Sequence, residues 1–182
     1  MSGLINVISF LIHIVITLYI YAVIIRMILG LAGTDIYNPF SQFIMAITNP
    51  ALLPLRKLIP SIRRIDTAAV LLILFLKFLE LFTRSYLVSK QVVLGALIIP
   101  TILGAINLVI NLFIFSIIIL VIISWIAPYI QSQNNPLVSI LRTITEPLLR
   151  PARKYIPPVG MFDLSPLVVL IALYCVQIFL NS

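Results

Sequence analysis

The chain contains one stretch twice, and this duplication constrains its fold more than any other feature. Residues 38–66 read NPFSQFIMAITNPALLPLRKLIPSIRRID, and residues 135–163 read NPLVSILRTITEPLLRPARKYIPPVGMFD. The two copies align without a gap, so that Asn38 matches Asn135. A match of this density between two halves of one chain indicates an internal repeat. Each copy lies between two long apolar runs, which predicts two units of one design: a span, a basic loop and a second span.

The prolines divide each copy into short segments. Pro39 fits the first position of a helix that Asn38 caps, and apolar side chains follow at helical spacing. A later proline ends one short helix or opens the next, because its ring removes a backbone N–H. This predicts two short amphipathic helices per loop that lie in the membrane interface, with a re-entrant hairpin as the open alternative. Asp66 is placed to cap the helix after the first loop, as Asp163 or Ser165 is after the second. The predicted structural residues of the motif are Pro39, Pro50, Pro54, Pro60, Asp66, Pro136, Pro147, Pro151, Pro157 and Asp163.

The apolar excess of the chain predicts a membrane protein. The 182 residues are 62% hydrophobic and 9% charged, whereas a soluble domain is roughly 45–50% apolar and about 25% charged. A globule of this size cannot bury so much apolar surface, so the solvent must be lipid. The predicted fold class is an all-α membrane protein with about four transmembrane helices, arranged as two repeats of parallel orientation.

The predicted boundaries follow from the apolar runs and the loops between them. The first repeat is residues 1–88, with spans at 4–32 and 67–88 and a basic loop at 33–66. The second repeat is residues 89–182, with a lead-in at 89–103, spans at 104–128 and 165–181 and a basic loop at 129–164.

The net charge of +7 does not by itself indicate nucleic-acid binding, because most basic residues lie in the two loops. Eight of the twelve lysines and arginines are found there: Arg56, Lys57, Arg63, Arg64, Arg142, Arg150, Arg153 and Lys154. Basic residues beside apolar spans set topology and attract anionic headgroups. We therefore predict that both loops are cytoplasmic and both termini lie outside. All of these residues except Arg142 are predicted to face anionic lipid or a partner protein.

A polar stripe runs along the even spans. Lys77, Glu80 and Arg84 share one helix face at i, i+3 and i+7, and the matched positions of the last span include Tyr174 and Gln177. Charges at membrane depth face the interior of a helix bundle or water. Two interpretations stay open: a structural polar seam between helices, and an ion or proton path.

The odd spans carry polar pairs at equivalent depth. His13 and Thr17 are four residues apart, and Asn107 and Asn111 align with them once a three-residue difference in the following loop is allowed. Such pairs predict hydrogen bonds between helices. His13 has no second histidine or carboxylate near it in the sequence, which favours a packing role over metal ligation.

The residue set offers little for catalysis. The chain has one histidine and one cysteine, Cys175, and it lacks a glycine-rich loop or a cluster of His, Cys and carboxylates. The matched aspartates Asp66 and Asp163 are better explained as helix caps than as paired carboxylates. We therefore expect no enzyme activity, no catalytic residue, no metal and no cofactor.

With the repeats laid out, the chain resembles the YggT family of bacterial inner-membrane proteins, which has relatives in plastids. The resemblance covers about residues 15–180. Its signature is Asn-Pro, Thr-Asn-Pro or Thr-Glu-Pro, Pro-Leu-Arg-Lys or Pro-Ala-Arg-Lys, Ile-Pro and Asp, in both copies. The chain departs from it at residues 61–65, where the family tends to have a glycine-containing turn. The resemblance implies a multi-pass protein of the bacterial inner (plasma) membrane.

The resemblance implies little mechanism. Family members are connected with osmotic tolerance and ion homeostasis, with cell division or nucleoid organisation and, in plastids, with haem attachment to a cytochrome. It carries over no catalytic residue set.

Two functions follow from the residues and the resemblance together. The first is a non-enzymatic accessory protein, a scaffold or assembly factor, that binds a membrane protein partner or anionic lipid through its paired basic loops. The alternative is a small oligomeric ion transporter or channel with the stripe of Lys77, Glu80 and Arg84 along its path. A homo-oligomer stays open under both, and we expect no direct contact with nucleic acid.

Overall fold

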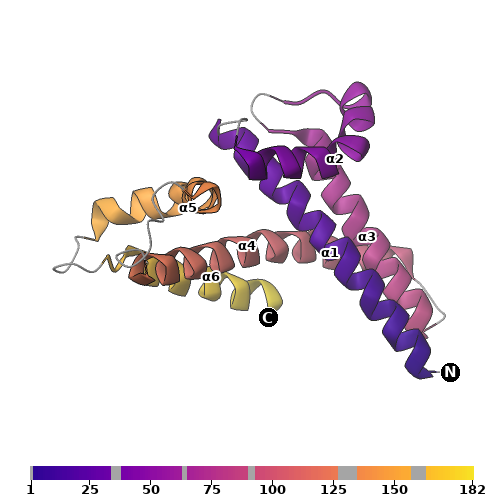
Figure 1. The fold of residues 1–182 in the computed structure, drawn as a ribbon. Coiled ribbons are helices and arrows are strands. Elements are labelled where there is room, and N and C mark those ends of the chain that lie inside the picture. Colours follow the sequence, from indigo (N-terminus) through magenta and orange to yellow (C-terminus); the bar gives the residue numbers. More distant parts are fainter. Residues whose placement is uncertain (1, 34–37, 63–64, 90–92, 127–134, 157–162) are drawn as a thin grey trace. The chain divides into compact units, whose positions relative to one another are not determined.

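The structure is a computed structural model that describes residues 2–33, 38–62, 65–89, 93–126, 135–156 and 163–182 (Figure 1). Its elements are α1 (Ser2–Ala32), α2 (Pro39–Leu58), α3 (Thr67–Ser89), the 3-10 turn η1 (Leu94–Leu97), α4 (Ile98–Ile126), α5 (Pro136–Tyr155) and α6 (Ser165–Asn181). The described part is all-α, as the sequence predicts, and its isolated β-bridge joins Ile62 to Ile65. The predictions made for Arg63, Arg64 and Pro157 lie outside the described residues.

The chain divides into two compact units. Unit 1 consists of Met1–Met27 and Ile44–Leu108, and unit 2 consists of Ile28–Phe43 and Val109–Ser182. Each unit takes most of one sequence repeat together with a segment of the other. The helices α1, α2 and α4 each run from one unit into the other.

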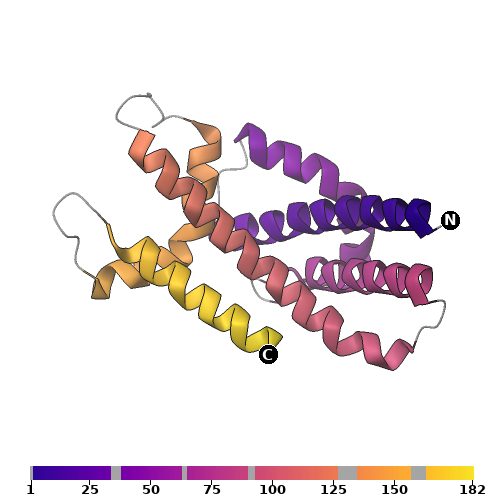
Figure 2. The same cartoon turned by 90° about the horizontal axis from the view of Figure 1, so that it is seen from below.

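In unit 1, α1 and α3 run side by side in opposite directions, as both views show (Figures 1 and 2). The core of this unit includes fully buried side chains of α1, α2 and α3: Ile20, Val23, Ile24, Leu52, Ala68 and Ala69. Two of the buried positions are alanines, and small side chains let helix backbones approach closely.

In unit 2, α5 packs against α6, and α6 runs beside the C-terminal part of α4 in both views (Figures 1 and 2). Ile117 of α4 and Ile144 and Leu149 of α5 are buried here, with 0%, 2% and 1% of their surface exposed. The loop helix of this unit therefore packs its apolar face into the core.

The loop helices are longer than the prolines predict. α2 and α5 each continue unbroken for 20 residues, with Pro50 and Pro54 inside the first and Pro147 and Pro151 inside the second. The prediction of two short helices per loop is therefore wrong. A proline removes one N–H and bends the helix, and the ribbon of α5 changes direction along its length (Figure 2). All four prolines are exposed, so other groups can hydrogen-bond the freed carbonyls outside the core.

α4 begins earlier than predicted. It begins at Ile98 rather than at residue 104, and the described part of the predicted lead-in contains the short turn η1. Pro100 falls in the first turn of α4, where its missing N–H has no intrahelical partner to lose. Gly104 lies within the helix and does not interrupt it.

Two stretches of the described chain are long and apolar enough to cross a membrane, Gly3–Ala32 and Leu94–Trp125. α3 contains three charged residues, and α6 is an apolar helix of 17 residues. Length and composition alone therefore support two membrane-crossing helices rather than the four that were predicted.

Candidate functional site

In both copies of the repeated segment, an arginine near the end of the loop helix forms an ion pair with an aspartate before the next helix. We call this ion pair the clasp. In unit 1, Arg56 at the end of α2 donates from Nε and Nη2 to Oδ2 of Asp66, with a distance of 3.1 Å from Nε. In unit 2, Arg153 at the end of α5 donates from Nε to Oδ2 of Asp163 at 2.9 Å. Each clasp spans 10 positions of the chain. It holds the last turn of the loop helix against the start of the following helix.

The two aspartates also contact the helices that follow them. Oδ1 of Asp66 accepts from the backbone N–H of Ala69 at 3.2 Å, and Oδ1 of Asp163 accepts from that of Ser165 at 2.9 Å. Each carboxylate thus uses one oxygen for the clasp and the other for the start of a helix. Burial raises the pKa of Asp163, but the hydrogen bonds from Arg153 and Ser165 outweigh it, and the pKa lies below its usual value of 3.8.

The contact of each aspartate with the start of the next helix follows from the sequence, but the arginine partners do not. The N-cap position of α6 is Leu164 rather than the predicted Asp163 or Ser165. A signal was present, because Arg56 with Asp66 and Arg153 with Asp163 occur at identical spacing in both copies. An Arg and an Asp that recur together at one spacing are candidates for an ion pair that the repeat preserves.

The other described basic residues of the predicted loop surface, Lys57, Arg150 and Lys154, are exposed. Lys57 is next to one clasp arginine and Lys154 is next to the other, and Arg150 lies one turn earlier on α5. None of these three forms an ion pair with a described residue, whereas the clasp arginines face carboxylates. The described part of the predicted lipid- or partner-facing set therefore divides into clasp arginines and exposed cations without an ion-pair partner among the described residues.

Unit 1 contains a cluster of His13, Lys77 and Glu80, in which the lysine and the glutamate are buried. Lys77 Nζ donates to both carboxylate oxygens of Glu80, at 3.1 and 3.0 Å, and His13 Nδ1 lies 2.7 Å from Oε1. Lys77 is 9% exposed and Glu80 is 2% exposed. A carboxylate buried to this depth has to be paired. Arg84 of the predicted stripe is exposed and lies outside the cluster.

His13 meets a carboxylate that its neighbours in the sequence do not supply. Its carboxylate partner is 67 positions away in the chain and reaches it only because α1 and α3 run together. The signal in the sequence was that His13 belongs to a polar pair on the first span. Such pairs predict hydrogen bonds between helices.

Gly104 of α4 makes room for the lysine of this cluster. A Cβ built at this glycine would lie 2.6 Å from Cε of Lys77. A larger residue would therefore displace the lysine side chain from the position in which it meets Glu80.

The matched seam of unit 2 is neutral. Gln177 of α6, which matches Glu80, donates from Nε2 to Oδ1 of Asn111 on α4 at 2.9 Å. This is one of the hydrogen bonds between helices that the polar pairs predict. Tyr174, which matches Lys77, is 48% exposed and lies on the surface of α6.

Arg26 joins α1 to α2 within unit 1. Its Nη1 donates to Oγ1 of Thr48 at 2.6 Å and lies 3.5 Å from the carbonyl oxygen of Met45. Thr48 has no exposed surface and donates its own hydroxyl hydrogen to the carbonyl of Ile44 at 2.7 Å.

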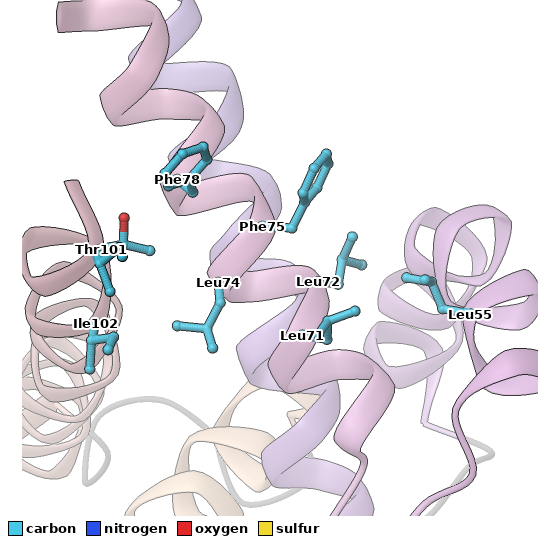
Figure 3. A pocket seen from close by; sticks show the side chains of 9 residues that line it. Leu55, Leu71, Leu72, Leu74, Phe75, Phe78, Thr101 and Ile102 are labelled. Atoms are coloured by element: carbon cyan, nitrogen blue, oxygen red, sulfur yellow. The ribbon is translucent and has the colours of Figure 1, made fainter. Parts of the chain in front are cut away.

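A cavity of about 580 Å³ in unit 1 is almost wholly apolar (Figure 3). Its lining comes from α2, α3 and α4: Leu55, Leu71, Leu72, Leu74, Phe75, Phe78, Ile98, Thr101 and Ile102. The hydroxyl of Thr101 is the polar side-chain group of this lining, and it donates to the carbonyl of Leu97 at 2.7 Å. The cavity suits hydrocarbon and presents no group for catalysis.

A second cavity, of about 380 Å³, lies between α4 and α5 in unit 2 and is polar. Its lining includes Leu120, Ser124, Arg142, Thr145, Glu146 and Arg153. Within the described residues, no group of three or more His, Cys, Asp or Glu side chains is placed to hold a metal ion. Cys175 is exposed on α6.

Comparison with known proteins gives a consistent result over both repeats. The chain matches the CCB3/YggT family over residues 5–87 and 99–182. An uncharacterised protein of Pseudomonas aeruginosa is 38% identical over 159 residues, which cover 86% of this chain and 79% of that protein. The uncharacterised protein YggT of Escherichia coli K12 is 31% identical over 172 residues, covering 94% of this chain and 88% of that one. An uncharacterised protein of Haemophilus influenzae is 37% identical over 169 residues, with 92% and 86% covered. No solved structure matches the chain.

Proposed function

The chain belongs to the CCB3/YggT family, and from this premise we propose that it is a non-enzymatic accessory protein of the bacterial inner membrane. It acts as a scaffold or assembly factor that contacts a partner protein and anionic lipid through its two loop helices. The observation that carries the proposal is the clasp. In both copies one arginine is held by an aspartate, and the next residue is an exposed lysine, Lys57 or Lys154.

In this proposal α1, α3, α4 and α6 all cross the membrane. α3 has 23 residues, which at 1.5 Å per residue is about 35 Å and exceeds a hydrocarbon core of about 30 Å. Its buried Lys77 and Glu80 neutralise each other, which lowers the cost of charge at membrane depth. α6 has 17 residues, at the lower end of the range of about 17–25 for a spanning helix. The positive-inside rule places both loop helices in the cytoplasm and both termini outside.

The loop helices lie in the cytoplasmic interface rather than re-entering the membrane. α5 buries Val138, Ile140, Ile144 and Leu149, while its Arg150 is exposed. A helix with one apolar and one basic face is suited to the headgroup region. A re-entrant hairpin needs a turn midway along the loop, and both 20-residue helices continue without one. The carbonyls freed by the exposed prolines can bond water or headgroups at the interface.

The clasp gives the exposed lysines a defined position. Arg56 and Arg153 join the last turn of each loop helix to the next span, so the adjacent lysine is presented at a constrained place above the membrane. Cations in the last turn of a helix are also favoured by the helix dipole. Each cation close to an anionic leaflet adds about 1 kcal/mol of attraction.

The test is cross-linking in native membranes, with a photoreactive residue in place of the exposed Leu58 of α2 or Tyr155 of α5. We expect one protein partner to be recovered in stoichiometric amount from both positions. The double variant Lys57→Gln, Lys154→Gln keeps both clasps and should lose most of this partner. Arg84→Gln removes an exposed cation outside the loops and is the matched control.

Cysteine accessibility in intact cells checks that each variant keeps its orientation, because removing loop charges can invert a topology. Cross-links only between copies of this chain would refute the accessory function. So would a yield of partner that does not change when Lys57 and Lys154 are replaced.

The second candidate function is ion transport, and the cluster of His13 with the buried Lys77 and Glu80 is the observation that favours it. Replacing Lys77 and Glu80 together by leucine separates the two functions. An accessory protein should still bind its partner after this change. A transporter should lose ion flux in reconstituted vesicles.

A further inference from the structure

The internal repeat gives each helix of the first half a counterpart in the second. α6 matches α3 by the same shift that takes Asn38 to Asn135, and the start of α4 matches the start of α1 by the shift that takes His13 to Asn107. In unit 1, α3 contacts the turn η1 and the start of α4. The same contact in the second repeat would join α6 to the start of α1.

In unit 1 this contact buries side chains of both helices. Gly104 of α4 lies against Lys77 of α3, which is 9% exposed. Thr101 and Ala105 share a helix face with Gly104 at i−3 and i+1, and they are 6% and 7% exposed. Phe78 and Thr101 line the apolar cavity together (Figure 3). The start of α4 therefore covers part of one face of α3.

The matched residues of α6 and α1 are exposed. Tyr174, which matches Lys77, is 48% exposed. On α1, the three residues that match the covering positions of α4 are Val7, Phe10 and Leu11, and they are 56%, 60% and 55% exposed. The second repeat thus has both faces of the contact seen in unit 1, and both are open.

We propose that α6 of one copy of the chain packs against the start of α1 in a second copy. The occupant is the chain itself, because the start of α1 is the segment that the repeat matches to the start of α4. A contact between two different faces is heterologous, and copies joined in this way form a ring where the rotation closes. The interface rests on the four-span topology of the proposed function and not on the accessory role.

The direction and depth of the helices suit this contact. In the proposed topology α3 and the following α4 cross the membrane in opposite directions, and so do α6 and α1. Lys77 and Tyr174 each lie near the middle of their helices, whereas Gly104 and Phe10 each lie in the first part of theirs. The residues that match a contacting pair of unit 1 can therefore meet at a similar depth in the bilayer.

The phenol of Tyr174 favours a helix over lipid at this face. It is exposed midway along an apolar helix and forms no hydrogen bond with a described residue. A polar group without a partner in hydrocarbon is costly, and polar side chains promote helix association in membranes. His13 lies one turn beyond Phe10 on α1 and is 45% exposed. Its Nδ1 faces Glu80, so Nε2 is the nitrogen that a second hydrogen bond would use. Lipid tails offer no such group.

The native cysteine provides the test. Cys175 is the one cysteine of the chain and matches Phe78, which lies beside Thr101 in unit 1, so Cys175 of one copy should lie near Val7 of the next. Two forms of the full-length protein with different tags are co-expressed, one wild type and one carrying Val7→Cys with Cys175→Ser. The native membranes are then oxidised. We expect a disulfide-linked dimer that contains both tags.

Val15→Cys with Cys175→Ser is the matched control for this experiment. Val15 is 66% exposed on α1, but it lies about 12 Å further along the helix than Val7 at 1.5 Å per residue. A disulfide needs Cα atoms within about 7 Å, so this variant should give no dimer with both tags. The wild type alone reports any disulfide between two copies of Cys175.

The strength of the association is measured by energy transfer between labelled copies in phosphatidylcholine vesicles. Tyr174→Ala should raise the dissociation constant about tenfold, as expected for the loss of an aromatic residue from an interface. Val176→Ala is its matched control, because it shortens an exposed side chain on another face of α6. It should leave the dissociation constant unchanged.

Equal dimer yields from Val7→Cys and Val15→Cys would overturn the interface, and so would a dimer of the wild type alone, which would join α6 to α6. The variant Val7→Cys that retains Cys175 detects a contact within one chain, and an oxidised monomer without dimer would also overturn the proposal. No dimer, with energy transfer unchanged by Tyr174→Ala, would assign both faces to lipid. A dimer with both tags but no partner in the cross-linking experiment would leave this interface standing and refute the accessory function alone.

Discussion

Replacing Glu80 by leucine leaves a buried lysine without its counter-ion. Lys77 is 9% exposed, and Glu80 accepts from its Nζ through both carboxylate oxygens. Removing one member of a buried ion pair costs about 3–5 kcal/mol, because the charge that remains is desolvated and unpaired. Replacing both members by apolar residues of similar size costs far less and can be neutral. We therefore expect Glu80→Leu alone to be strongly destabilising, and Glu80→Leu with Lys77→Met to recover most of that loss.

The coupling between the two positions is the quantity to measure. A double-mutant cycle on the protein in mixed micelles, unfolded with increasing SDS, should give a coupling free energy of about 2–4 kcal/mol. His13→Ala should cost less than Glu80→Leu, because the His13 side chain is 45% exposed and its loss leaves Glu80 paired with Lys77. Glu80→Leu costing under about 1 kcal/mol would refute the reasoning, as would a double variant that is no more stable than the single one.

Three further predictions concern the clasp, the glycine beside the cluster and the threonine of α2. The pKa of Asp163 is lowered in the folded chain. Its clasp therefore contributes its full stability above the unfolded pKa of about 3.9, and this contribution is lost as the pH falls through the lower folded pKa. Arg153→Gln should make thermal stability depend less on pH in this acidic range. Gly104→Ala should destabilise by about 1–3 kcal/mol in the same micelle assay, since the new methyl group displaces the lysine beneath it. Gly30→Ala is its control, having nothing within 4 Å, and should be neutral or stabilising. Thr48→Val should lower the free energy of unfolding by about 1–3 kcal/mol, because Arg26 loses the hydroxyl oxygen to which it donates. An equal loss on replacing the matched threonine of the second repeat would show that Arg26 is not the cause.

Helix starts could be predicted because their signals are local. Asn38 accepts from the backbone N–H of Phe40 and Asn135 from that of Leu137, both at 2.9 Å, as the Asn-Pro pairs predict. Asp66 contacts the start of α3 in the same way. Each of these contacts joins residues two or three positions apart, so a reading of neighbouring residues is enough to find it.

The prolines show where a local rule fails. Taken alone, Pro50 and Pro54 predict that a helix ends, because each removes an N–H and crowds a carbonyl. In the structure both are exposed within a continuous α2. The cost of the lost hydrogen bonds depends on whether the freed carbonyls can find partners outside the core, and this depends on how α2 packs.

The repeat, the family, the helical class and the caps of α2, α3 and α5 can be inferred from the sequence alone, because these depend on composition, periodicity and residues a few positions apart. The packing of the helices brings Glu80 to His13 across 67 positions. It also closes each clasp across 10 positions. These contacts depend on which helices lie side by side. That pairing is set by the burial of many side chains at once, so no single motif in the sequence encodes it.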